Sequence, residues 1–402
     1  MSRPALCALA CALALAAALL SGCVPEAPST PNAASATPSA RTPSPTPTPT
    51  STPALSCAES IVAALSPQER AGQLIVAALG ANEDVTLLDP LVAQYHLSGV
   101  VLLSGWDGGA GTVRAAADHL QSLAGEATGG LGLLVSADQE GGQIQQLRGD
   151  GFTDLPSGLQ QGALDPGVLR ESARAWGAEL AAAGVNLNLA PVADVVPPEL
   201  GRGNPPIGGY DRQYSSDPVA AASSVVAFVE GMSQAGVAST VKHFPGLGRV
   251  TGNTDVTAEG TTDAVTGAAD VGPFVAGIEA GAQVVMMSSA FYTQLDPADE
   301  AVFSPAIVTG LLRGELGFDG VVMSDDIGVA AAVSSTPVEE RATRFVAAGG
   351  DIALTADPAA VAPFHDSLVI AMAADPAFAD LVEASAVRVV QLKLDLGLAS
   401  CD

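Results

Sequence analysis

Residues 218–242 read PVAAASSVVAFVEGMSQAGVASTVK, and this stretch shows the unit that decides the fold. Its first part, Pro218–Ala235, is rich in alanine and has helical character. A glycine follows, and then a short apolar run, Ala238–Lys242, that reads as a β-strand. The run has few polar residues, as expected for a parallel strand that is covered on both faces. The stretch therefore predicts one helix followed by one buried strand.

The same alternation of helix and strand runs through the chain from about residue 57 onward. Seven further apolar runs predict strands, at Gln73–Ala78, Gly99–Leu103, Gly132–Ala137, Asn186–Ala190, Gln283–Met287, Gly320–Met323 and Asp351–Leu354. Helix-like segments lie between them, among them Thr112–Ala124, Pro166–Ala183 and Pro337–Ala348. Eight strands alternating with helices predict an α/β fold, a (β/α)8 TIM-type barrel in a single catalytic domain. An open doubly wound sheet is the alternative. No G-x-G-x-x-G or Walker loop opens a helix, so a nucleotide site is not expected.

The composition limits the classes of protein to which the chain can belong. It has 402 residues, a formal net charge of −27 and 48% hydrophobic residues. So much apolar material can form a sizeable core, which excludes a mainly disordered protein. The acidic balance argues against binding to nucleic acid and against direct binding to an anionic lipid surface.

Residues 1–22 have the pattern of an export signal, in which Arg3 precedes an apolar run, Ala5–Leu20. This run is shorter than the roughly 20 residues that a membrane-spanning helix needs. It ends at Leu20-Ser21-Gly22-Cys23, which resembles the lipobox of bacterial lipoproteins. The resemblance implies that Cys23 carries acyl chains that hold the protein at the outer face of a membrane. The alternative is a soluble secreted protein.

Residues 23–56 are expected to form a stalk, and residues 57–402 the barrel domain. The stalk segment is rich in proline, serine and threonine, has no aromatic residue and cannot build a core. Outside the signal and the lipobox, the remaining cysteines are Cys57 and Cys401, one at each end of the domain. In an oxidising compartment a disulfide between them is expected, and two free thiols are the alternative.

Polar side chains follow five of the predicted strands: Asp138 and Glu140, Asp194, Lys242 and His243, Ser288 and Ser289, and Asp325 and Asp326. In a barrel these side chains meet at the carboxyl-end rim, where such enzymes hold their active sites. Any one of the aspartates could instead cap the following helix. Paired carboxylates suit cleavage of a glycosidic bond, and they would also suit a magnesium-dependent enzyme. The four histidines have no ligand-like spacing, so zinc is not expected.

Three sequence motifs resemble those of a known protein family. Lys242–Gly248 reads KHFPGLG and resembles the K-H-F-P-G-x-G signature of glycoside hydrolase family 3. Asp138–Gly142 (DQEGG), followed by Gly151–Pro156 (GFTDLP), resembles the β-N-acetylglucosaminidase (β-N-acetylhexosaminidase) branch of that family, and so does Val322–Asp326 (VMSDD). The motifs occur in the family's order, and the resemblance covers about residues 60 to 395.

The resemblance implies a role for each matching residue. Asp325 corresponds to the nucleophile, which forms a glycosyl-enzyme intermediate and gives overall retention. Asp138 corresponds to the carboxylate that binds hydroxyls of the terminal sugar ring, so attack would be exo-type. Lys242 and His243 correspond to the pair that bonds the same ring from the opposite side. Arg212 corresponds to the family arginine near the sugar, by a looser match.

Two positions depart from the family pattern. The second family arginine, expected after the E-G-G turn, is replaced by Gln143 and Gln146, and Arg148 could substitute for it. On the loop after the fifth strand, the branch carries D-S-H with a histidine acid/base, whereas this chain has Asn253-Thr254-Asp255. We expect Asp255 to be the proton donor, with its pKa raised by burial or by the charge of Asp325. The alternative is that Asp255 only caps a turn and that activity is weak or lost.

The sequence thus predicts an exo-acting, retaining β-N-acetylglucosaminidase that hydrolyses terminal β-linked N-acetylglucosamine from cell-wall or related saccharides. It would be extracytoplasmic, lipid-anchored to the cell membrane and monomeric. No metal or organic cofactor is expected, because carboxylates can carry this chemistry. The alternatives are a non-catalytic or weakly active sugar-binding lipoprotein on the same barrel, and a family 3 β-glucosidase.

Overall fold

The computed structural model describes residues 55–401. The expected export signal, the lipidation site Cys23 and all but the last residues of the expected stalk lie outside the described residues. In the described part of the chain, no helix combines the length and the apolar character that crossing a membrane requires.

Within residues 55–401, eight parallel strands close into a barrel in the order β1-β13-β12-β9-β7-β6-β3-β2. They are β1 (Ile75–Gly80), β2 (Gly99–Leu103), β3 (Leu134–Ala137), β6 (Leu187–Asn188), β7 (Ala238–Phe244), β9 (Val284–Met287), β12 (Val321–Asp326) and β13 (Ile352–Thr355). β1 closes the ring, because Ile75 pairs with Ala353 on β13 and Val76 pairs with Gly99 on β2. Each strand overlaps one of the predicted apolar runs. The barrel is confirmed, and the open sheet is wrong.

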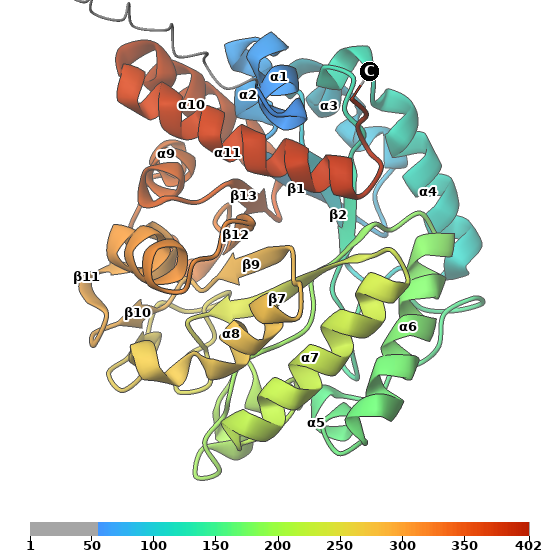
Figure 1. Ribbon diagram of the computed structural model, residues 1–402, viewed down its shortest axis with the longest axis vertical. Coiled ribbons are helices and arrows are strands. Elements are labelled where there is room, and N and C mark those ends of the chain that lie inside the picture. Colours follow the sequence, from blue (N-terminus) through green and yellow to red (C-terminus); the bar gives the residue numbers. More distant parts are fainter. Residues whose placement is uncertain (1–54, 402) are drawn as a thin grey trace, which may run out of the picture. The chain divides into compact units, whose positions relative to one another are not determined.

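Helices follow the strands and surround the barrel (Figure 1). These are α3 (Asp89–Tyr95), α4 (Gly109–Leu123), α6 (Pro166–Ala182), α7 (Pro218–Gln234), α8 (Gly272–Glu279), a π-helix (Ala306–Glu315), α9 (Val338–Ala348) and α10 (Val361–Ala374). The starts of α6 and α7 follow from the sequence. Asp165 and Asp217 precede a proline at the first helical position, and their carboxylates accept backbone N–H groups of the first turn. Further helices are α1 (Cys57–Ala64), α2 (Pro67–Gly72), α5 (Gly158–Gln161) and α11 (Pro376–Asp395).

Two small sheets that were not predicted lie beyond the carboxyl ends of the barrel strands. β4 (Gln139–Gly141) and β5 (Ile144–Gln145) form a hairpin directly after β3. β8 (Thr262–Asp263), β10 (Phe291–Tyr292) and β11 (Asp296–Glu300) form the other sheet. The β4–β5 turn requires glycine at Gly141, where φ is 108° and a Cβ would lie 2.2 Å from the Pro156 carbonyl oxygen. The hairpin therefore places Glu140 at the rim in a fixed orientation.

Apolar side chains fill the barrel interior up to the level of the polar rim. The interior cluster takes residues from the strands, one directly after β6 and two from α11, namely Val76, Ala78, Val101, Leu134, Leu187, Leu189, Ala238, Val284, Met286, Val321, Met323, Ile352, Leu354, Val389 and Leu392. Because α11 supplies Val389 and Leu392, this helix closes the amino end of the barrel. The carboxyl end remains available for a site.

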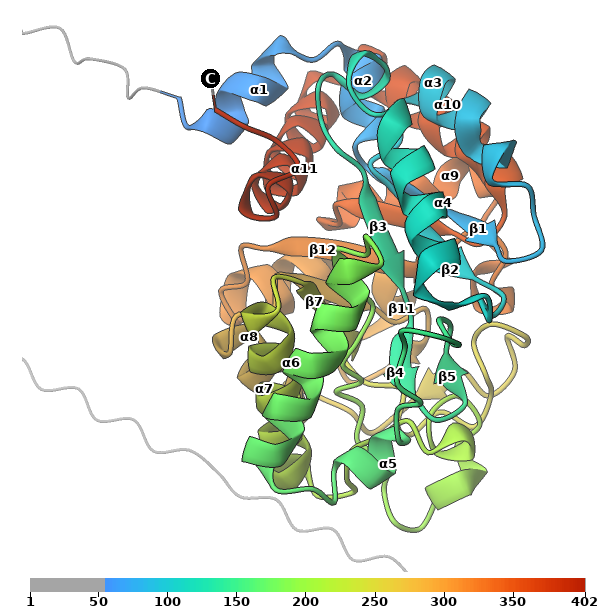
Figure 2. The same cartoon turned by 90° about the vertical axis from the view of Figure 1, so that its right-hand side faces the viewer.

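The two ends of the described chain are joined covalently. A disulfide links Cys57, at the start of α1, to Cys401, with 5.8 Å between the two Cα atoms. Figure 2 shows the C-terminus beside α1. Of the two states that the sequence left open for these cysteines, the structure contains the bridge.

Candidate active site

A cavity of about 350 Å³ opens at the carboxyl end of the barrel. It is lined by all six residues for which the sequence predicts catalysis or sugar binding: Asp138, Arg212, Lys242, His243, Asp255 and Asp325. Asp138 directly follows β3, and the others come from β7, β12 and the loops after β6 and β7. The cavity wall also contains apolar side chains such as Leu103, Leu189 and Met286. Polar groups over an apolar wall are typical of a pocket for a small polar molecule.

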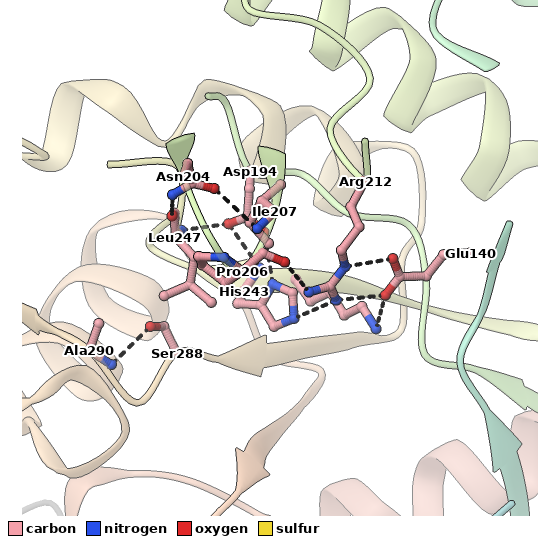
Figure 3. A network of polar contacts seen from close by, with 12 residues as sticks. Glu140, Asp194, Asn204, Pro206, Ile207, Arg212, His243, Leu247, Ser288 and Ala290 are labelled. Atoms are coloured by element: carbon pink, nitrogen blue, oxygen red, sulfur yellow. Dashed lines mark hydrogen bonds and ion pairs between the residues drawn. The ribbon is translucent and has the colours of Figure 1, made fainter. Parts of the chain in front are cut away.

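Lys242 and Arg212 are bound to two carboxylates on one side of the cavity. The Lys242 ammonium lies 2.5 Å from Asp138 Oδ1 and 2.6 Å from Glu140 Oε1. Arg212 donates two hydrogen bonds to Glu140, from Nε at 2.9 Å and from Nη2 at 2.7 Å. Figure 3 shows the two side chains facing each other. This bidentate geometry fixes the plane of the guanidinium.

His243 is oriented by a third carboxylate, that of Asp194. Its Nδ1 lies 2.7 Å from Asp194 Oδ2, and its Nε2 lies 3.2 Å from Arg212 Nη2. Because a guanidinium can only donate, Nε2 accepts and the ring proton is on Nδ1. Asp194 is fully buried, and its Oδ1 also accepts the backbone N–H of Leu247 at 2.7 Å. The KHFPGLG segment is thus tied to the loop after β6 (Figure 3).

Charge pairing sets the ionisation of this buried cluster. Burial opposes ionisation of Glu140, but the charges of Arg212 and Lys242 outweigh it and lower the pKa of Glu140 to about 2. Burial opposes the charge of Lys242 as well, and Asp138 and Glu140 overcome it and raise the pKa of Lys242. The cluster therefore stays ionised at neutral pH. It presents a rigid set of donors and acceptors to a ligand.

Asp325 and Asp326, at the end of β12, have different environments. Burial raises the pKa of Asp325 to about 6, and the charge of Asp255 adds to the shift against the opposing influence of His243 and Lys242. The Asp326 carboxylate accepts three backbone N–H groups through Oδ1, from Gly328 at 2.8 Å, Ala356 at 3.1 Å and Val329 at 3.3 Å. Asp326 therefore has a structural role, because its carboxylate fixes the backbone of the two neighbouring segments. Both residues line the cavity, but Asp325 has the less satisfied carboxylate, whose Oδ1 accepts one backbone N–H, from Asp326 at 2.9 Å.

Asp255 lies on the loop between β7 and β8, and its side chain does not cap a turn. Asn253 performs that task, because its Oδ1 accepts the Asp255 N–H at 3.0 Å and its carbonyl accepts the N–H groups of Val256 and Thr257. Among residues 55–401, no hydrogen bond or ion pair engages the Asp255 carboxylate. Asp255 is exposed, so the burial considered for it from the sequence is wrong, and its charge contributes to the raised pKa of Asp325.

One expectation about this rim is wrong. Arg148 does not replace the missing second arginine, because it does not line the cavity. Its guanidinium donates to the Gly142 carbonyl at 2.8 Å and to Asp154 at 3.3 Å, which turns it away. Gln146 lines the cavity instead, and its Oε1 accepts the Gly105 N–H at 3.0 Å.

Residues 67–392 match the glycosyl hydrolase family 3 N-terminal domain. The chain belongs to glycosyl hydrolase family 3. The match runs from the start of α2 into α11 and so includes every barrel strand and every residue of the cavity.

Solved and curated relatives agree with this assignment. The β-N-acetylhexosaminidase of Beutenbergia cavernae has a TM-score of 0.79 and is 48% identical, over 82% of this chain and 98% of that one. A β-hexosaminidase of Stenotrophomonas maltophilia is 43% identical over 234 residues, which are 56% of this chain and 67% of the relative. The family 3 β-N-acetylglucosaminidase of a Paenibacillus strain has a TM-score of 0.72 at 28% identity, over 84% of this chain and 64% of that one. This family 3 member is a glycoside hydrolase, and relatives of this kind act on carbohydrates.

Sequence reasoning gave no role to two buried carboxylates of this family 3 hydrolase. Glu140 binds Arg212 and Lys242 together, and Asp194 orients His243. Both follow a predicted strand, so their place at the rim could be predicted. Their partners could not, since Glu140 and Arg212 are 72 residues apart and meet only in the closed barrel. In the part of the chain from residue 55 to 401, no group of three or more His, Cys, Asp or Glu side chains could hold a metal ion.

Proposed function

We propose that the chain is an exo-acting, retaining β-N-acetylglucosaminidase. The observation that carries the proposal is that Asp325, Asp255, Lys242 and Arg212 line the same cavity. The names of the similar β-N-acetylhexosaminidases support the choice of sugar. The alternative is another family 3 glycosidase on the same barrel, and the experiment below separates these activities.

In the first step, Asp325 attacks the anomeric carbon and forms an ester bond to the sugar. The bond from that carbon to the leaving oxygen breaks, and the proton of Asp255 moves to this oxygen. In the second step, water adds to the anomeric carbon as the ester breaks, and Asp255 takes the proton of the water. Two inversions give overall retention. Asp325 has to be ionised at the start, so the reaction needs a pH above its pKa of about 6.

The charged cluster would bind hydroxyls of the terminal ring. Asp138 keeps part of its carboxylate accessible, with 19% of the side chain exposed, whereas Lys242 is 1% exposed. Lys242 therefore positions Asp138, and Asp138, Arg212 and His243 meet the sugar. Such a ring of donors and acceptors surrounds one terminal residue, which supports exo-type attack. The substrates would be cell-wall or related saccharides with N-acetylglucosamine at the non-reducing end.

Hydrolysis of p-nitrophenyl N-acetyl-β-glucosaminide, compared with the matching β-glucoside, tests this proposal. We expect turnover of the first substrate and little of the second, with the β-anomer of the sugar seen first by proton NMR. Asp325→Ala should abolish turnover, and Asp380→Ala, an exposed aspartate on α11, should not. Sugar binding without turnover of either substrate would instead favour a binding protein. Preferred turnover of the glucoside would indicate a β-glucosidase.

We also propose that the protein is exported, anchored by lipid at Cys23 and active as a monomer outside the cytoplasm. The lipobox-like sequence before Cys23 supports the anchor. Labelling with an alkyne fatty acid tests it. Wild-type protein should be labelled and fractionate with membranes, and Cys23→Ala should do neither. Equal labelling of both proteins would refute the anchor, and a dimer in sedimentation would refute the monomer.

A further inference from the structure

Residues 327–333, which follow Asp325 and Asp326, are held in place by the buried Arg341 and the half-buried Asp326. Arg341 on α9 is buried, and its Nη1 donates to the carbonyls of Ile327 at 2.9 Å and Gly328 at 2.7 Å. From the other side, the Asp326 carboxylate accepts the N–H groups of Gly328 and Val329. Close packing adds to this, because a Cβ on Gly328 would lie 1.9 Å from Thr355 Oγ1. The segment is therefore a fixed extension of β12.

This segment contacts the loop that carries Asp255. The N–H of Ala331 donates to the Asp255 carbonyl at 3.2 Å, and the N–H of Ala332 donates to the Thr254 carbonyl at 3.0 Å. Thr254 and Ala332 are both buried at this contact. β7 and β12 are separated in the barrel by β9, so the loop after β7 reaches across one strand to make it (Figure 1).

Nothing else outside its own loop fixes residues 253–257 by hydrogen bonds in the described part of the chain. Their other backbone bonds are local, from Val256 and Thr257 to the Asn253 carbonyl and from Asp255 to the Asn253 side chain. Bonds of Thr251 and Gly252 to Gly260 only close the base of the loop. The orientation of Asp255 toward the cavity thus depends on the two bonds from Ala331 and Ala332.

We propose that residues 327–333 are the positioning platform for the acid/base, with the N–H groups of Ala331 and Ala332 as its positioning groups. This inference rests on the proposed role of Asp255. In this arrangement Arg341 and Asp326 together fix the position of the nucleophile at the end of β12. Through the platform they also fix the position of the proton donor on a different loop. Because the two carboxylates act on the two sides of one bond, a common support keeps them in register during the reaction.

Ala331→Pro removes the hydrogen bond from residue 331 to the Asp255 carbonyl, because proline has no backbone N–H. Ala331 is the first residue of a 3₁₀ helix, Ala331–Val333, where a proline is tolerated and where the N–H has no partner within the helix. Ala330 has φ −55° and ψ 134°, a conformation that suits a residue before proline. The matched control is Ala268→Pro. Ala268 is also the first residue of a 3₁₀ helix, is exposed and follows an extended residue.

The measurement is kcat/KM for a series of aryl β-N-acetylglucosaminides that differ in the pKa of the leaving phenol. Losing a positioned general acid slows poor leaving groups, whereas activated phenols need little protonation. We expect Ala331→Pro to lower kcat/KM by about tenfold or more for the poorest leaving group and by less than about twofold for the best, within the range that general acids contribute. Ala268→Pro should leave the whole series unchanged. Equal effects of Ala331→Pro across the series would overturn the inference.

Asp255→Asn separates this inference from the proposed acid/base. If Asp255→Asn shows the leaving-group dependence and Ala331→Pro does not, the platform is wrong and the acid/base stands. If Asp255→Asn shows none, both are wrong. Should Ala331→Pro not fold, hydrogen exchange of the Ala331 and Ala332 amides in the wild-type protein decides instead. Slow exchange that is accelerated by Asn253→Ala supports the platform, and exchange as fast as in a free loop contradicts it.

Discussion

Replacing Asp325 by asparagine is expected to stabilise the protein while removing its activity. Asp325 lines the cavity at the end of β12, and burial raises its pKa from 3.8 to about 6. A raised pKa means that the folded protein favours the neutral acid over the carboxylate. An ionised Asp325 therefore costs stability that an uncharged asparagine of nearly the same size does not.

The pKa shift gives the magnitude. A rise from 3.8 to about 6 is about 2 units, and each unit corresponds to ~1.4 kcal/mol, so the upper limit is about 3 kcal/mol. The side chain is partly exposed to the cavity. Solvent screening reduces the effect there, and we expect the free energy of unfolding to rise by about 1–2 kcal/mol.

The gain should depend on pH in a defined direction. Below pH 3.8 the carboxyl group is neutral in both the folded and the unfolded chain, so wild type and variant differ little electrostatically. Between pH 3.8 and about 6 the unfolded chain releases its proton and the folded protein keeps it, so wild type loses stability as pH rises. Above about pH 6 the loss is complete.

Urea unfolding of wild type and Asp325→Asn at pH 4.5 and pH 7.5, with the disulfide intact, measures this difference. The advantage of the variant should be larger at pH 7.5. Asp380→Asn, on the exposed side of α11, controls for the loss of one negative charge. An advantage that is equal at the two pH values, or a variant less stable than wild type at pH 7.5, would refute the reasoning.

Three further predictions concern Asp325, Glu140 and Lys393, a buried residue of α11. First, kcat/KM should fall as pH decreases through about 6, because Asp325 must be ionised to attack; a profile that stays flat down to pH 5 would contradict this. Second, Glu140→Gln should raise KM and lower the free energy of unfolding by about 3 kcal/mol or more, because Arg212 and Lys242 lose a buried counter-charge, as kinetics and urea unfolding can show. Third, burial lowers the pKa of Lys393 from 10.5 to about 7, so Lys393→Met should gain more stability over wild type at pH 6 than at pH 9, with a difference of at least about 1 kcal/mol in urea unfolding.

Much of the fold could be predicted because each barrel strand is a short apolar run between polar segments. Strand ends were less certain. The first strand was expected at Gln73–Ala78 and lies at Ile75–Gly80, since the N–H of Gln73 still bonds to Glu69 in the turn that ends α2. β7 continues past Lys242 to Phe244, although its pairing with β9 shifts register between Val241 and Phe244, where Lys242 and His243 lie. Polarity alone therefore does not mark the end of a strand at the rim of a barrel.

The residues of the candidate site could be predicted from the strand ends, but their hydrogen-bond and ion-pair partners could not. The partners of Glu140 and Asp194 come from distant loops, which only the closed barrel brings together. The sequence left open whether Arg148 replaces the missing arginine, and it does not, because bonds to Gly142 and Asp154, each six residues away, hold its guanidinium. Local sequence carries residue types and strand ends. Side-chain pairing depends on tertiary contacts.

The central claim is that Asp325 is the nucleophile of a retaining N-acetylglucosaminidase. Incubation with a mechanism-based fluorosugar derived from N-acetylglucosamine, followed by mass spectrometry of the digested protein, tests it most directly. We predict that one sugar is covalently attached to the peptide that contains Val321–Asp326 and that fragmentation places it on Asp325. A label on Asp326 or on another peptide, or turnover of substrate with no covalent label, would contradict the claim.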